Sequence, residues 1–242
     1  MTASQQTGRR SRLPIVIAVA VLAVLALGIG GIVYLFAGSA PAGVSLSTSS
    51  PGASGALGSL DGTWSVDTTT GSFSDFSDTF VGYRVNENLA QVGSATAVGR
   101  TPKVSGSLTF AGTTITAVKI TADLTALQSD KSMRDGQLRQ QALETGQFPT
   151  ATFELATPIQ LPAAPVDGQT SSVTAQGKLT LHGVTKDVSI PLQAKLSGST
   201  VTVVGSLKIQ FADYSINPPQ SMMVLSVDDF GVMELQLLFA KG

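Results

Sequence analysis

Few side chains of this 242-residue chain could carry acid–base or metal chemistry. The chain contains a single histidine, His182, and no cysteine. A zinc site normally needs several histidine or cysteine ligands, so zinc catalysis of that type is disfavoured. A serine–histidine–aspartate triad would have to use His182, which lies in a strand-like stretch with no nucleophile-elbow sequence nearby. We therefore expect His182 to be a structural or surface residue.

Paired carboxylates are the other candidates for catalysis, as in glycosidases. Asp228 and Asp229 are adjacent, but neighbours on an extended chain point to opposite faces, so this pair predicts a turn. Arg134, Asp135 and Arg139 are typical of a solvated helix face. No glycine-rich phosphate loop follows a strand and opens a helix. The sequence therefore predicts a protein that is not an enzyme and holds no metal.

Alternation of apolar and polar residues is the main secondary-structure signal after Asp61. Short glycine-containing breaks separate the alternating segments, and each segment presents one apolar face, which is typical of antiparallel sheet. Long amphipathic strands tend to close into a barrel, because closure removes exposed edges. We therefore expect an all-β domain, an antiparallel barrel of about eight strands. The clearest strands cover residues 104–110, 118–124, 188–196, 201–211 and 233–239.

One segment has helical spacing instead. Ser132 and Asp135 resemble the two ends of an S-x-x-D capping box, and Gly146 supplies a stop. Asp135 and Arg139 are one turn apart and are expected to pair on the solvent side. The sequence thus predicts one short helix, over about 132–145, within the β domain.

The N-terminal part of the chain has a different pattern. An apolar run, Leu13–Phe36, follows three arginines, and no charged residue comes after it until Asp61. As a helix this run would reach roughly 36 Å, enough to cross a hydrocarbon core of about 30 Å. Arginines on one side only indicate that residues 1–12 stay in the cytoplasm. The sequence predicts a single transmembrane helix over 13–37, which anchors an extracytoplasmic domain in the cell membrane.

A cleaved secretory signal is the alternative for this run, because Gly38, Ser39 and Ala40 would suit a signal peptidase. A signal h-region is usually about 7–15 residues long, however, and this run is longer. Both interpretations export the remaining chain. Residues 38–60 are nearly all Gly, Ser, Ala, Pro and Thr, which predicts a flexible linker before a domain over 61–242.

Composition narrows the range of partners. Charged residues make up 13% of the chain and the net charge is −1, so nothing attracts nucleic acid. Without cysteine there is no disulfide framework, and the exported domain must be held together by its own core.

Three motifs resemble those of the YceI-like family and occur in the same order over nearly the whole domain. Trp64–Asp67 resembles its W-x-V-D opening. Arg134–Asp135 with Phe148–Phe153 resembles its R-D-x-x-L…F-P-x-x-x-F block. Gly177–Lys186 resembles its G-x-L-T-hydrophobic-x-G-V-T-K/R motif. The chain departs from the family where Phe80–Val85 replaces an F-S-V-x-H strand, and where Gly136 replaces a histidine.

The resemblance implies a lipocalin-like barrel that holds a polyisoprenoid or isoprenoid-quinone-like chain, and no other cofactor. An eight-stranded barrel is just wide enough to be filled by side chains or to hold one slender ligand. The alternative is a solid barrel that serves as a structural or interaction domain of the cell envelope. In the lipid-binding interpretation, Gly205 leaves a gap for the chain. The expected apolar lining comprises Phe110, Ile120, Phe153, Leu181, Leu192, Gly205, Ile209, Phe211 and Leu235.

Overall fold

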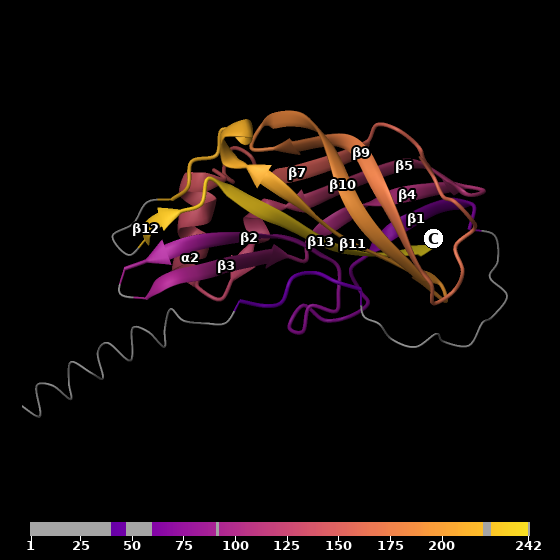
Figure 1. Ribbon diagram of the computed structural model, residues 1–242, viewed down its shortest axis with the longest axis horizontal. Coiled ribbons are helices and arrows are strands. Elements are labelled where there is room, and N and C mark those ends of the chain that lie inside the picture. Colours follow the sequence, from indigo (N-terminus) through magenta and orange to yellow (C-terminus); the bar gives the residue numbers. More distant parts are fainter. Residues whose placement is uncertain (1–39, 47–59, 91, 220–223, 242) are drawn as a thin grey trace, which may run out of the picture. The chain divides into compact units, whose positions relative to one another are not determined.

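The alternating segments form the wall of a β-barrel in the computed structural model (Figure 1). The structure describes residues 40–46, 60–90, 92–219 and 224–241. The transmembrane helix predicted over 13–37 lies outside these residues, as does much of the linker predicted over 38–60. Within the described ranges, no helix is long and apolar enough to cross a membrane.

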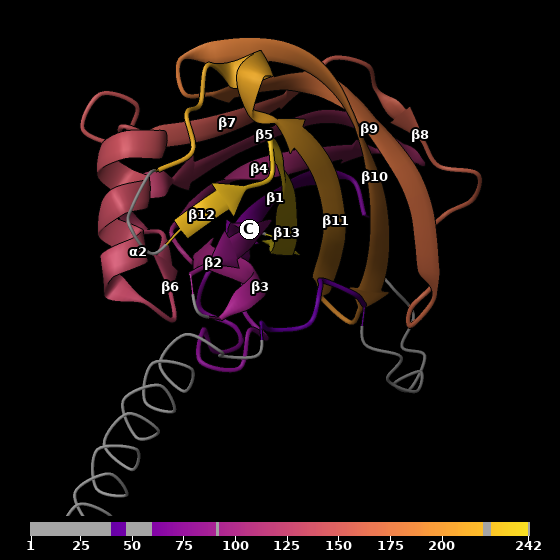
Figure 2. The ribbon, with the colours of Figure 1, turned by 60° about the vertical axis from the view of Figure 1, so that its left-hand side comes forward.

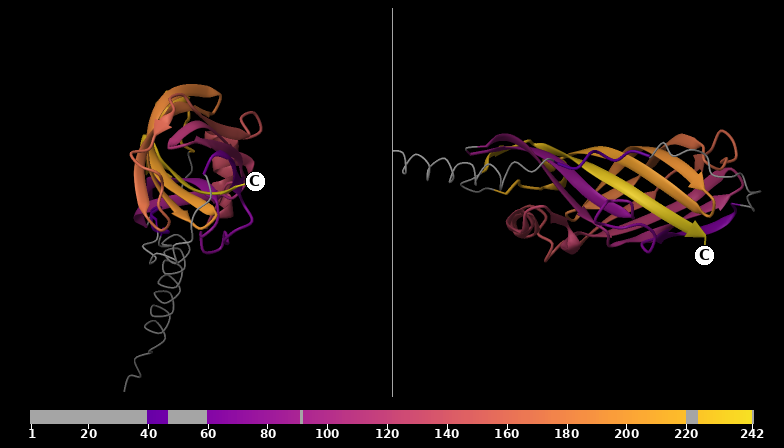
Figure 3. Two further views of the ribbon diagram at one scale, coloured as in Figure 1. Left: turned by 90° about the vertical axis from the view of Figure 1, so that its right-hand side faces the viewer. Right: turned by 90° about the horizontal axis from the view of Figure 1, so that it is seen from below.

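Eight antiparallel strands close into a ring, as the alternation predicted. Each strand in the ring pairs with the next, and β1 completes it by pairing with both β4 and β13. Seen along its length, the sheet curves around an interior, and seen from below its strands slant across the barrel (Figure 3). In ring order the strands are β1 (Gly62–Asp67), β4 (Val104–Ala111), β5 (Thr114–Asp123), β7 (Thr150–Leu155), β9 (Thr170–Leu181), β10 (Val184–Ser197), β11 (Thr200–Gln210) and β13 (Phe230–Lys241).

The wall is extended at one end by a second set of strands. The C-terminal part of β13 pairs with β1, whereas its N-terminal part pairs with β2 (Phe80–Leu89). β3 (Gly93–Thr101) follows on β2, and β6 (Gln128–Ser129) follows on β3. Two short strands, β8 (Ile159–Gln160) and β12 (Val224–Val227), pair with β5 and β2. At this end the helix α2 stands beside β6 and β7 (Figure 2).

The predicted helix is present but shorter, and its polar contacts were predicted wrongly. α2 covers Ser132–Gln137 and continues as a π-helical turn over Leu138–Ala142. Lys131, not Ser132, is the N-cap, and it makes no side-chain capping bond. Asp135 is buried and accepts hydrogen bonds from the backbone N–H and hydroxyl of Ser129. It does not pair with Arg139 on the solvent side, because β6 packs against this face of the helix.

Apolar residues fill the barrel in two clusters. The first includes Trp64, Phe110 and Phe239, and the second includes Leu143 and Ile209 near α2. Met233 packs against both clusters. Apolar side chains are therefore present along the whole interior, and the two clusters meet at β13.

Residues 40–46 lie against the outside of the wall rather than free as part of the predicted linker. Arg84 donates from Nη2 to the carbonyl oxygen of Pro41 at 2.7 Å, and Arg100 donates from Nη2 to that of Ala42 at 3.2 Å. Both arginines also pair with the buried Glu234, at 3.0 and 3.4 Å. These contacts offset the entropy that is lost when a short segment with few apolar residues becomes ordered. The composition of the segment alone does not predict this ordering.

Two glycine-to-alanine changes should have opposite effects on stability. Nothing lies within 4 Å of a Cβ built on Gly136 in α2, so Gly136→Ala should stabilise the domain by about 0.5–1 kcal/mol. A Cβ on Gly205 would lie 2.5 Å from Leu192 Cδ2 and 2.9 Å from the carbonyl oxygen of Pro191. Gly205→Ala should therefore destabilise it by about 1–3 kcal/mol. Urea denaturation measures the change in the free energy of unfolding for both variants. If both variants are stabilised, or both destabilised, the packing described is contradicted.

Candidate ligand-binding cavities

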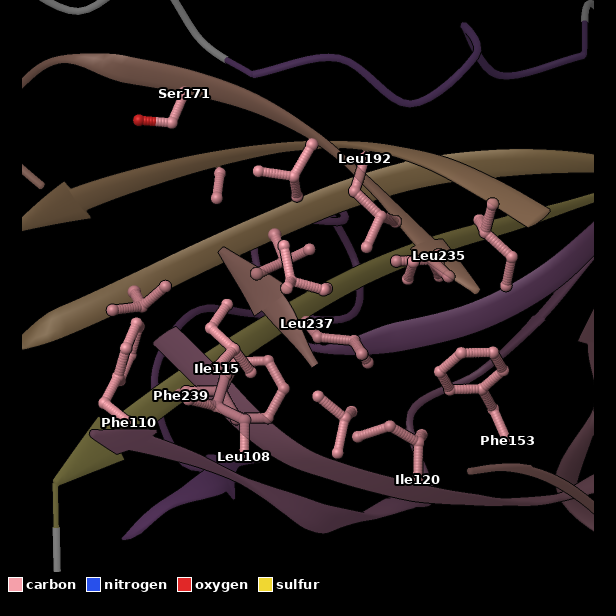
Figure 4. Close-up of a pocket in the computed structure, with 18 of the residues that line it drawn as sticks. Leu108, Phe110, Ile115, Ile120, Phe153, Ser171, Leu192, Leu235, Leu237 and Phe239 are labelled. Carbon is pink, nitrogen blue, oxygen red and sulfur yellow. The ribbon is translucent and has the colours of Figure 1, made fainter. Parts of the chain in front are cut away.

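The first cavity, cavity 1, lies inside the closed ring of strands. It has a volume of about 130 Å³ and is lined almost entirely by apolar side chains. Leu108, Phe110 and Ile120 reach it from one side, and Leu192 and Leu235 from the other (Figure 4). Such a lining offers burial but almost no hydrogen-bonding groups, which suits a hydrocarbon chain.

The second cavity, cavity 2, lies beneath α2 and has a volume of about 150 Å³. Leu138 and Leu143 line it from the helical segment, and Ile209 of β11 and Phe211 just after β11 line it from the opposite wall. Charged side chains also reach its wall. Charged residues therefore border the interior only towards the helix end of the barrel, among the residues that the structure describes.

The two cavities share part of their lining. Val81, Ala151, Leu179 and Met233 border both. Each cavity is about as large as an engineered apolar cavity of ~150 Å³ that remains dry and binds benzene. The two cavities therefore adjoin at these side chains, and one of them, Met233, is of the flexible type that fills irregular gaps. The barrel is thus not a uniformly packed core.

Eight of the nine predicted lining residues border cavity 1 or cavity 2. Phe110, Ile120, Phe153, Leu192 and Leu235 line cavity 1, and Leu181, Ile209 and Phe211 line cavity 2. Whether they contact a ligand stays a prediction.

Gly205 differs from this expectation. It borders neither cavity 1 nor cavity 2, because Leu192 of the neighbouring strand fills the space in front of it. The missing side chain thus accommodates a protein neighbour. Sequence alternation along one strand cannot reveal this, since it depends on the register with β10.

His182 lies in the turn between β9 and β10, not in a strand as expected, and has a positive φ of 50°. It is buried, with its ring 4.5 Å from that of Phe148. Its Nδ1 lies 3.0 Å from the carbonyl oxygen of Tyr214, and its Nε2 lies 2.9 Å from Oε2 of Glu144. His182 therefore joins three segments near the helix end, which is a structural role.

Sequence reasoning did not place any polar residue on the wall of cavity 2, where the structure has Tyr83, Glu87 and Arg134. Arg134 Nη2 donates to Glu87 Oε1 at 2.7 Å, so it does not lie on a solvated helix face as predicted. Tyr83 is largely buried, and this burial raises the pKa of its phenol. The alternation of Val81, Tyr83, Val85 and Glu87 was the signal available for finding them, because residues two apart share a face.

The remaining titratable groups do not assemble into a further centre. Among the residues that the structure describes, no group of three or more histidine, aspartate or glutamate side chains could hold a metal ion. Asp228 and Asp229 lie in the turn between β12 and β13, as predicted. Asp228 accepts a hydrogen bond from the side chain of Asn86 at 3.2 Å.

Comparison with known proteins agrees with this barrel. The family model described as "YceI-like domain" matches residues 64–237. The chain belongs to the YceI-like family. A UPF0312 protein of Pseudomonas paraeruginosa is 31% identical to this YceI-like chain over 156 residues, covering 63% of this chain and 70% of the relative. A UPF0312 protein of Vibrio vulnificus is 28% identical over 141 residues, covering 54% and 71%.

Two solved structures share the fold of this YceI-like domain. One is a polyisoprenoid binding domain from Saccharophagus degradans implicated in plant cell wall breakdown, with a TM-score of 0.56 and 19% identity. The match covers 74% of this chain and 98% of the Saccharophagus degradans domain. The other is BcnA of Burkholderia cenocepacia, with a TM-score of 0.55, 20% identity, and coverage of 72% and 98%. At these identities the likeness supports the fold alone.

Replacing His182 should lower stability. His182→Gln can keep only part of the arrangement, because the two amide atoms share one carbon and cannot take the places of both ring nitrogens, which contact Tyr214 and Glu144. We expect a loss of about 1–2 kcal/mol in the free energy of unfolding. Thermal or urea denaturation measures it. Lys186→Gln, at an exposed position on β10, is the control and should change stability by less than about 0.5 kcal/mol.

Proposed function

We propose that this YceI-like domain binds a polyisoprenoid lipid, or an isoprenoid quinone of similar shape, inside its barrel. The observation that carries the proposal is the pair of apolar cavities with a common wall at Val81, Ala151, Leu179 and Met233. The Saccharophagus degradans domain of the same fold, named for polyisoprenoid binding, adds support. No catalytic step is part of this function.

The binding energy would come from burial. Each methylene removed from water contributes about 0.8 kcal/mol, so a few isoprene units would bind without any polar contact. As they stand, the two cavities each accept a group about the size of one benzene ring. A longer chain would pass between them once the Met233 side chain turns aside, and methionine has the rotatable bonds for this.

The alternative, a solid barrel with a structural role, predicts an interior filled by side chains. Natural cores contain few voids larger than a water molecule. Two adjoining cavities of about 130 and 150 Å³ favour the lipid-binding function instead.

We further propose that the domain works outside the cell membrane, on a single-pass anchor with a cytoplasmic N-terminus. The support is the apolar run Leu13–Phe36 behind three arginines. An anchored barrel would stay beside the bilayer from which a hydrophobic lipid must come.

Filling the common wall of the cavities should abolish lipid binding. Ala151→Phe places a ring where both cavities meet, so we expect loss of the lipid that co-purifies with the full chain. The cost in stability should stay below about 1.5 kcal/mol, because the ring occupies empty space. Mass spectrometry of organic extracts, alongside thermal denaturation, measures both effects.

Thr150→Phe is the matched control, since Thr150 is the neighbouring residue of β7 and is exposed. It should retain lipid as the wild type does. A wild type that co-purifies with no lipid, together with strong destabilisation by Ala151→Phe, would contradict lipid binding and favour the solid barrel.

The orientation can be tested with protease. In cells whose outer envelope has been made permeable, added protease should digest the C-terminal domain and leave an N-terminal tag protected. A domain that is shielded until the inner membrane is broken would contradict the proposed orientation. The mass of the mature chain distinguishes an uncleaved anchor from a cleaved signal.

A further inference from the structure

The inner face of β2 changes character along its length. Val81 borders both cavities, and Tyr83, Val85 and Glu87 follow it along the wall of cavity 2. Cavity 1 has no charged residue in its lining among the described residues, whereas cavity 2 has Glu87 and Arg134. A ligand that fills both cavities would therefore meet charged groups at one end only.

Tyr83 is the member of this group with hydrogen-bonding capacity to spare. Its ring lies across Gly99 on β3, so close that a Cβ there would lie 2.8 Å from the phenol oxygen. That oxygen is buried, and it has no hydrogen-bond partner among the residues that the structure describes. An unpaired buried hydroxyl is unfavourable, so a ligand atom that pairs with it once the ring turns towards cavity 2 gains affinity.

The charges around Tyr83 determine which ligand atom suits it. Arg134 is held between Glu87 and Asp130, each at 2.7 Å, and Lys131 lies 3.5 Å from Asp130. Asp135 adds a third carboxylate and is already bonded to Ser129. This cluster thus contains three carboxylates and two cations, of which Glu87 and Arg134 border cavity 2. An added phosphate would meet net negative charge and would have to compete for an arginine that is already paired.

We propose that cavity 2 holds the polar end of the lipid, with the Tyr83 hydroxyl donating a hydrogen bond to a neutral oxygen of its head group. The oxygen is a quinone carbonyl or a prenyl hydroxyl, and the hydrocarbon chain extends towards cavity 1. The site discriminates against prenyl phosphates. This inference rests on the proposed lipid-binding function.

The test compares head groups on the purified full-length protein. The probes are geranylgeraniol, a ubiquinone with two isoprene units, geranylgeranyl phosphate and squalene, which has no head group. The wild type should bind the alcohol and the quinone more tightly than the phosphate. Tyr83→Phe should weaken binding of the alcohol and the quinone about three- to tenfold and leave squalene unchanged. If only one of the two weakens, that one identifies the head group.

Stability and a second tyrosine provide the controls. Tyr83→Phe removes an unpaired hydroxyl and keeps the ring, so its melting temperature should be unchanged or higher. Tyr214→Phe removes a hydroxyl from a tyrosine in the same apolar cluster that borders neither cavity 1 nor cavity 2, and should bind all probes as the wild type does.

The outcomes separate the two proposals. Equal binding of alcohol and quinone by the wild type and Tyr83→Phe would overturn the head-group site while leaving lipid binding intact. Tighter binding of geranylgeranyl phosphate than of the alcohol would also overturn it. A wild type that binds no probe, squalene included, would contradict the proposed function itself.

Discussion

The pairing of β1 with both β4 and β13 is the contact on which the rest of the domain depends. It turns a twisted sheet into a ring, so that the backbone groups of its eight strands find partners without open edges. Trp64 fixes this closure from inside. Its indole N–H donates to the carbonyl oxygen of Leu60 at 2.9 Å, and its ring meets that of Phe110 edge-on at 6.1 Å. Cavity 1 is enclosed because this ring of strands is closed.

β13 is the second element that organises the barrel, because it has different neighbours along its length. Its inward side chains line the cavities, while the outward Glu234 is buried under Arg84 and Arg100. Arg100 lies 4.2 Å from the ring centre of Phe76 and 4.3 Å from that of Phe80, and burial lowers its pKa. Breaking such a buried pair is costly, typically about 3–5 kcal/mol, so this part of the wall is held rigidly. A rigid wall leaves the side chains inside as the adaptable part of the site.

The two ends of the interior have different chemistry for a topological reason. At the β1 end, the closed ring of strands provides most of the cavity wall, and its lining has no charged residue among those that the structure describes. At the other end, β2, β3 and β6 extend the wall, and α2 brings Arg134 to Glu87. Backbone and carboxylate groups at this less regular end need partners, and the cluster of Arg134, Glu87, Asp130 and Asp135 provides them. Polarity in the barrel thus follows from where its regular strand pairing stops.

The sequence by itself determined where the long strands lie, which face of each is apolar, and that one short helix interrupts them. It could do so because alternation and helical spacing are local properties of the chain. The motifs around Trp64, Arg134–Asp135 and Gly177–Lys186 were also sufficient to indicate the family. Only the tertiary structure decided what the residues contact. Arg134 meets Glu87 from a distant strand, Leu192 fills the space beside Gly205, and residues 40–46 lie on the barrel wall. Whether a barrel contains cavities depends on how side chains from many strands fill a common volume, and no local pattern encodes that volume.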